Sequence, residues 1–155
     1  MKYSHYLLLF VWSLSLNAQN QLDTLQAKQY LQIADSLRNI KENALALEYY
    51  PKAIAIFKLA NQWENYLEAA INESICLRKT GQMEEVLNQL NELLEIVKTR
   101  NLHKTLIEAN IYHQLGVYYY YQNDYEKAIE EYQNALEIRK LKLGNNNTIV
   151  LRGYY

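Results

Sequence analysis

Residues 109–142 read ANIYHQLGVYYYYQNDYEKAIEEYQNALEIRKLK, and this stretch decides the fold class. Its apolar and small residues recur at spacings of three, four and seven, first over residues 112–119 and again over residues 128–135, which is typical of amphipathic helices. The polar trio at residues 122–124 separates the two runs and offers an N-cap for the second. The stretch therefore predicts a helical hairpin.

Small residues in this stretch indicate how its two helices pack. Gly116 and Ala128 leave room for the two backbones to approach closely, and Tyr112, Tyr119 and Tyr132 are large enough to fill the space around them. We interpret these residues as packing positions.

The same pattern recurs earlier in the chain. Residues 46–53, ALEYYPKA, align without a gap with residues 128–135, AIEEYQNA. The small-residue markers Ala46, Val86 and Ala128 are 40 and 42 residues apart, and such a near-constant period indicates a helical repeat array. The predicted units cover residues 27–60, 67–100 and 109–142, with a partial fourth at residues 149–155.

The third unit resembles the tetratricopeptide repeat family, and the period near 42 residues is similar to the long-helix variant of that family. The resemblance covers residues 24–155 and implies an all-α solenoid of antiparallel helical hairpins. It also implies that the first helices of successive units line a concave groove for a protein or peptide segment. The matching groove positions are Lys28, Asp35, Arg38, Arg78, Asn110, His113, Val117 and Tyr120.

Pro51 falls inside the second helix of the first unit. There it removes one backbone hydrogen bond and clashes with the carbonyl of Leu47, at a cost of roughly 3 kcal/mol. We expect a kink between Leu47 and Tyr50, after which the helix resumes as one element.

The first residues differ from the rest of the chain. Lys2 precedes an apolar run, Tyr6–Leu16, that is shorter than the roughly 20 residues of a membrane-spanning helix, and the small residue Ala18 follows it. This predicts a secretory signal peptide at residues 1–18 and a linker at residues 19–23, with an uncleaved anchor as the alternative. We therefore expect an exported, periplasmic or secreted protein without a membrane span in its mature chain.

Composition and motifs argue against several functions. The 16 basic and 17 acidic residues include no long basic run, so nucleic-acid binding is not expected. Cys76 stands alone, the histidines lack metal-ligand spacing, and glycine-rich phosphate motifs are missing. We expect no enzyme activity, no metal and no cofactor.

The sequence therefore predicts an exported scaffold that binds a protein or peptide partner in its groove. The alternative is the N-terminal extracytoplasmic sensor part of a longer bacterial signalling protein, such as a histidine kinase that carries tetratricopeptide repeats. We also expect self-association through the C-terminal end, where Ile129, Leu136 and Leu143 share one helix face.

Overall fold

The computed structural model describes residues 21, 23–145 and 147–152, and every regular element in these ranges is a helix. The first helix occupies residues 23–39. It is followed by α2 (Asn43–Ala46), α3 (Tyr50–Leu59), α4 (Trp63–Lys79), α5 (Met83–Thr99), α6 (Leu106–Tyr121), α7 (Tyr125–Leu143) and α8 (Thr148–Arg152). The predicted signal peptide, most of the linker and residues 153–155 lie outside the described residues.

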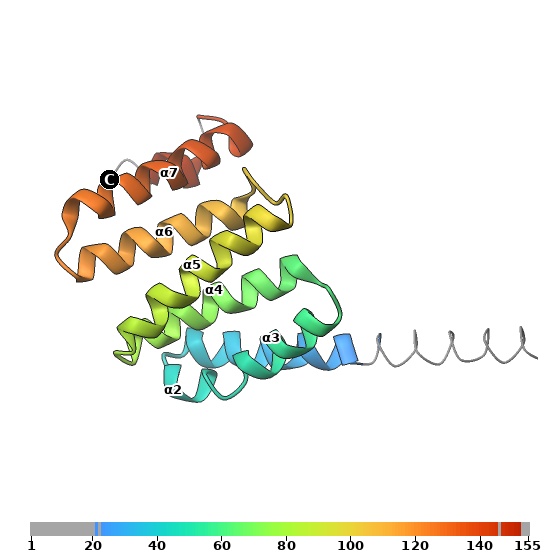
Figure 1. Cartoon of the computed structure of the whole chain (residues 1–155). Helices are drawn as coiled ribbons and strands as arrows, with labels where there is room; N and C mark the ends of the chain where they lie inside the picture. The colour runs from blue at the N-terminus through green and yellow to red at the C-terminus, as the bar shows by residue number, and fades with distance from the viewer. Residues whose placement is uncertain (1–20, 22, 146, 153–155) are drawn as a thin grey trace, which may run out of the picture.

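The helices stack as successive hairpins, as Figure 1 shows, with the first helix, α2 and α3 at one end and α6 and α7 towards the other. The α6–α7 pair has the most extensive contact, and α4 contacts both α5 and α6. Such stacking, in which each hairpin buries its apolar face on the next, is the arrangement of an α-solenoid. The predicted fold class is confirmed.

One type of turn ends five of the helices. Each of these helices closes with one residue in the left-handed conformation. In chain order, the first helix closes with Lys41, α3 with Asn61, α4 with Gly81, α5 with Asn101 and α6 with Asn123. In each turn the following N–H donates to the carbonyl five residues earlier, as from Glu42 to Leu37 at 2.9 Å. This is the Schellman motif, which satisfies the last helical carbonyls. In four of the five turns the next helix begins after three residues.

The connection from α5 to α6 is longer, and it explains why the repeat period increases from 40 to 42 residues. It covers residues 100–105 and contains a second left-handed residue, Lys104. Thr105 caps α6 by accepting a hydrogen bond from the Glu108 N–H at 3.2 Å. The buried Glu108 carboxylate accepts from the Lys104 N–H and lies 3.3 Å from His103 Nδ1, so it holds the extra turn in place.

Pro51 divides its helix, so the prediction of one continuous element was wrong, although the expected kink at residues 47–50 is present. The backbone changes to i→i−3 bonds, from Glu48 to Leu45 at 3.1 Å and from Tyr49 to Ala46 at 3.0 Å. These tighter turns bend the chain just before Pro51, which cannot donate a bond to the Leu47 carbonyl. As a result Pro51 stands in the first turn of α3, where a missing N–H costs little.

The core follows the small-residue pattern of the sequence. Ala46, Val86, Ala128 and Ala135 are all buried, as the repeat alignment predicted. A main cluster runs from the first helix to α6, and a second cluster joins Ala34, Ala46, Tyr50 and Cys76. The lone cysteine is therefore a buried packing residue.

Candidate binding site

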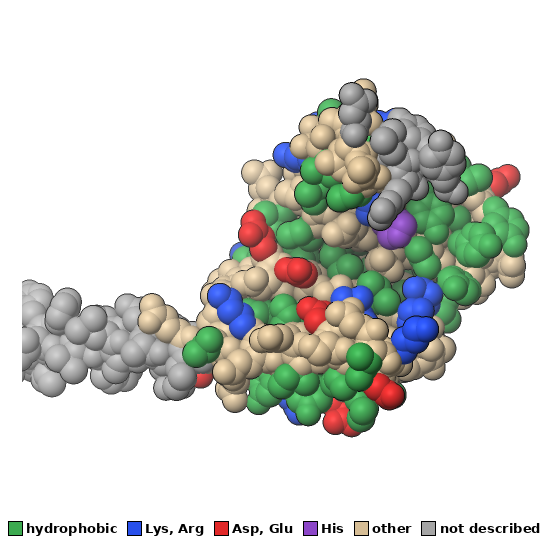
Figure 2. Space-filling model, turned by 180° about the vertical axis from the view of Figure 1, so that it is seen from behind, with side chains coloured by type: hydrophobic (Ala, Val, Ile, Leu, Met, Phe, Trp, Pro, Cys, Tyr) green, Lys and Arg blue, Asp and Glu red, His purple; other side chains and the backbone are tan. Residues whose placement is uncertain are grey.

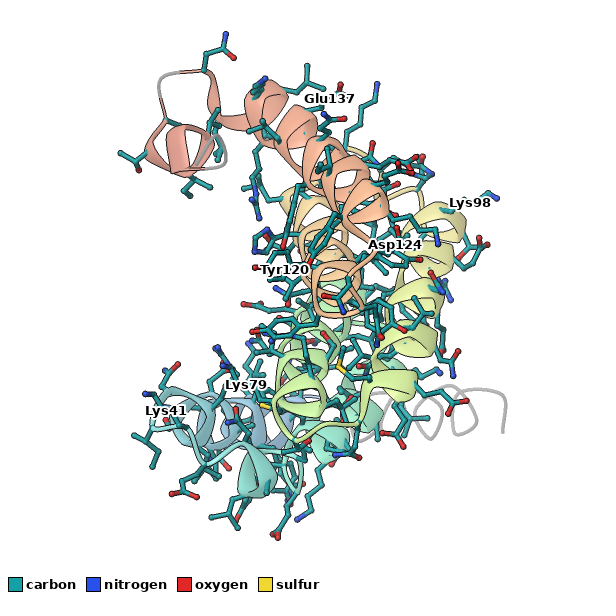
Figure 3. The ribbon with its side chains drawn as sticks, turned by 90° about the vertical axis from the view of Figure 1, so that its left-hand side faces the viewer. Lys41, Lys79, Lys98, Tyr120, Asp124 and Glu137 are labelled. Atoms are coloured by element: carbon teal, nitrogen blue, oxygen red, sulfur yellow. The ribbon has the colours of Figure 1, made fainter. Side chains whose placement is uncertain are left out.

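The stacked hairpins form an arc whose open side lies between the first helix and α8 (Figure 3). Tyr120 and Lys79 lie on this open side, whereas Lys98 on α5 lies on the opposite side. Figure 2 looks onto the open side and shows basic and acidic side chains interspersed across its middle and lower part, with apolar side chains at one edge. We call this side the concave face.

At one end of the concave face, Asp35 and Arg38 belong to a hydrogen-bonded network. The Tyr50 hydroxyl donates to Asp35 Oδ1 at 2.6 Å, and Arg38 Nε donates to the same hydroxyl at 3.0 Å. Asn72 of α4 donates to Asp35 Oδ1 at 3.1 Å, and Arg38 Nη2 lies 3.5 Å from that oxygen. The network therefore joins the first helix to α3 and α4.

Burial explains why this network is needed. Tyr50 is fully buried, and burial together with its hydrogen bond to Asp35 raises the pKa of its phenol far above the ordinary value. A buried hydroxyl without a partner would cost about 1–3 kcal/mol. Asp35 and Arg38, both predicted groove residues, thus satisfy polar groups of the fold.

Nearer the middle of the concave face, cationic and aromatic side chains from three helices lie together. The Arg78 guanidinium of α4 stands 5.1 Å from the centroid of the Tyr121 ring of α6. The His113 ring of α6 stands 5.5 Å from that of Tyr132 on α7. The cation–π contact therefore joins two successive hairpins, and the tilted ring pair joins the two helices of the last hairpin.

Arg139 of α7 completes this group. Its Nη2 donates to Asn110 Oδ1 of α6 at 3.2 Å. Burial lowers the pKa of the His113 imidazole, and the charges of Arg139 and Arg78 lower it further. Asn110 stands one turn of α6 before His113, so its hydrogen bond with Arg139 lies next to His113 on the same helix face.

Tyrosines form one edge of the concave face. The Tyr120 ring lies 5.9 Å from the Tyr121 ring and 5.8 Å from the Tyr125 ring. More than half of each of these three side chains is exposed, between 54% and 61%. Exposed tyrosines combine a large apolar area with a polar tip, which suits binding surfaces.

The remaining predicted groove residues are Lys28, exposed on the first helix, and Val117, half-buried on α6. The sequence interpretation missed Arg139 and Tyr121, because it drew the groove from selected positions of first helices only. One signal was available for Arg139: it lies seven residues after Tyr132 and thus shares its helix face.

In the described ranges, no three His, Cys, Asp or Glu side chains are grouped so that they could hold a metal ion. None of the helices in the same ranges is long and apolar enough to cross a membrane.

The hairpin of α6 and α7, which supplies most of these side chains, has a recognisable pattern. Residues 109–140 match the tetratricopeptide repeat family. This tetratricopeptide unit coincides with the third predicted repeat, and with the helical stacking it supports a tetratricopeptide-type protein.

A solved structure is similar to the whole array. It is the crystal structure of BtubC (BKLC) from P. vanneervenii, with a TM-score of 0.59 and 14% sequence identity. The similarity covers 87% of this chain and 63% of that chain, and at this identity it concerns the fold alone. No curated protein matches the chain.

Proposed function

We propose that this protein is an exported tetratricopeptide scaffold that holds a protein or peptide segment in a groove on its concave face. The observation that carries the proposal is the exposed tyrosine edge, Tyr120, Tyr121 and Tyr125, beside the group of Arg78, His113 and Arg139. Aromatic and arginine side chains are the residues that most often dominate binding energy at protein interfaces. The tetratricopeptide match of residues 109–140 supports a role in protein interaction.

Export is part of the proposal and is tested separately. The sequence at residues 1–18 motivates it. N-terminal sequencing of the protein from its native host should find a chain that begins near Gln19 outside the cytoplasm. Soluble cytoplasmic protein that begins with Met1 would contradict export without affecting the proposed groove.

The binding role is tested by a triple substitution on the concave face, Asn110→Ala, His113→Ala and Tyr120→Ala. The matched control carries Asn91→Ala, Glu95→Ala and Lys98→Ala, three exposed residues of α5. Partners are captured from the native host with each form after crosslinking, and the captured proteins are quantified by mass spectrometry. We expect the concave variant to lose partners that the control retains.

Both variants are checked for folding by thermal unfolding. This matters because Asn110 accepts from Arg139 and the His113 ring contacts Tyr132, so their loss also weakens packing. Equal capture by a folded concave variant and by the control would exclude the third unit from partner binding.

A further inference from the structure

On the concave face stand two arginines and a histidine from three different helices, and no ion pair among the described residues joins any of them to a carboxylate. Arg78 belongs to α4, His113 to α6 and Arg139 to α7. The ion pairs among the described residues involve Arg38, Lys58, His103 and Lys127 as cations. In the described part of the chain, Arg78 and Arg139 therefore carry positive charges that no ion pair neutralises.

These charges are also partly removed from water. Burial lowers the pKa of Arg139, and the buried Arg78 Nε has no hydrogen-bond acceptor among the described residues. A cation that loses water without gaining a counter-charge raises the free energy of the folded protein. An arriving anion would reverse that cost and would be attracted more strongly than on an open surface.

The groups next to Arg78 and Arg139 do not neutralise the positive charges of these two side chains. Tyr121 lies under Arg78 and Tyr132 lies beside His113, and neither side chain carries a carboxylate. The Asp35 carboxylate, at the other end of the concave face, is already engaged by Tyr50 and Asn72. The electrostatic complement of the Arg78, His113 and Arg139 group is therefore an anion.

The surroundings favour an anion that is carried by a peptide. Tyr120 and Tyr125 are exposed and extend the surface beyond Tyr121, whose ring contacts Arg78. An apolar residue beside an acidic one would thus find a tyrosine edge and a cationic group next to each other. A free small anion would use only the second of these.

We infer that Arg78, His113 and Arg139 form a binding site for an Asp or Glu side chain of the peptide segment held on the concave face. This inference rests on the proposed binding function and specifies the chemistry of the partner. The two guanidinium groups supply planar donor pairs that match a carboxylate. Asn110 orients one of them by accepting from Arg139.

The test selects peptides from a random displayed library against the full chain and measures the affinity of the selected peptides by fluorescence anisotropy. We expect the selected peptides to contain an acidic residue beside an apolar or aromatic one. Replacing that acidic residue by its amide should weaken binding about tenfold. Arg78→Gln and Arg139→Gln should each have a similar effect.

Lys98→Gln is the matched control, because it removes one positive charge from the opposite side of the molecule (Figure 3). We expect it to change the affinity by no more than about twofold, since distant exposed charges are screened by salt. Thermal unfolding of each variant verifies that it is folded. The effects of peptide amidation and of Arg78→Gln should not add, because both remove the same contact.

Three outcomes would overturn the inference. Selected peptides that Tyr120→Ala weakens but the arginine variants do not would refute the acidic site and leave the proposed function intact. Tighter binding of a phosphoserine peptide than of its Glu counterpart would assign the site to a phosphorylated partner instead. Failure to select any peptide that responds to Tyr120→Ala or to the arginine variants would refute both the site and the proposed function.

Discussion

Gly116 of α6 lies directly against the ring of Tyr132 of α7. A Cβ atom on Gly116 would stand 2.6 Å from both Cδ1 and Cε1 of that ring, well inside van der Waals contact. The ring cannot move away freely, because the His113 ring stands 5.5 Å from it on the other helix. The absence of a side chain at residue 116 therefore determines how closely the two helices approach.

Gly116→Ala should accordingly destabilise the protein. Alanine improves helix propensity by up to about 1 kcal/mol, but overpacking a close contact costs about 1–3 kcal/mol. We expect a net loss of about 1 kcal/mol in the free energy of unfolding, measured by urea denaturation.

The same substitution in a Tyr132→Ala background provides the control. Without the ring the added methyl group meets no close neighbour of that kind, so Gly116→Ala should stabilise this variant by up to about 1 kcal/mol. An equal effect in both backgrounds would mean that the Tyr132 contact does not limit the helix approach.

Lys41 offers a second test, because it occupies a left-handed conformation with φ of 68°. A side chain in that region costs roughly 1 kcal/mol, and glycine avoids this cost. Lys41→Gly should therefore increase the free energy of unfolding by about 0.5–1 kcal/mol. The equivalent turn already has a glycine at residue 81, with φ of 88°, so Gly81→Ala should lower stability by a similar amount.

Periodicity predicted the fold because close packing needs small residues at fixed places. Ala46, Val86 and Ala128 are buried where the repeat alignment placed them, and Gly116 makes the close approach that its position indicated. Lys41 was not identified as a left-handed residue, since the Schellman turn is set by backbone bonds that tolerate several residue types.

The binding face was harder to predict for a different reason. Asp35 and Arg38 stand on the first helix as expected, but Tyr50 of α3 engages both of them in hydrogen bonds. Arg139 also lies on the concave face, but it belongs to α7, the second helix of its hairpin. The chemistry of the face thus depends on contacts between helices, which a one-dimensional repeat register does not contain.

His113 predicts a dependence of stability on pH. Burial and the charges of Arg139 and Arg78 lower its pKa in the folded protein, while Tyr132 is its neutral aromatic neighbour. The unfolded chain therefore binds a proton at a higher pH than the folded chain does. The contribution of His113 is fully present above the unfolded pKa, roughly 6.5, and is lost as the pH falls through the folded value.

The comparison of wild type with His113→Gln isolates this contribution. Thermal unfolding is measured between about pH 7.5 and pH 5 for both proteins. We expect the melting temperature of the wild type to fall more steeply on acidification than that of the variant, which has no imidazole to protonate. Parallel curves would show that protonation of His113 is not coupled to folding.

The exposed side chains in the first two turns of α7 lead to the last prediction. Ile129 is 57% exposed one turn after Tyr125, which is 54% exposed, so the two form an apolar surface on the same helix face. Exposed apolar surfaces of this kind usually mark contacts between proteins. We expect the protein to self-associate through this face at high concentration, which light scattering or sedimentation velocity over a concentration series would detect.

Ile129→Lys should shift the protein to the monomer, because a lysine charge would have to be buried in the contact. Leu59→Lys is the matched control, since Leu59 is 84% exposed on α3 and should leave the association unchanged. A wild type that stays monomeric, or an equal effect of both substitutions, would exclude this face as the contact.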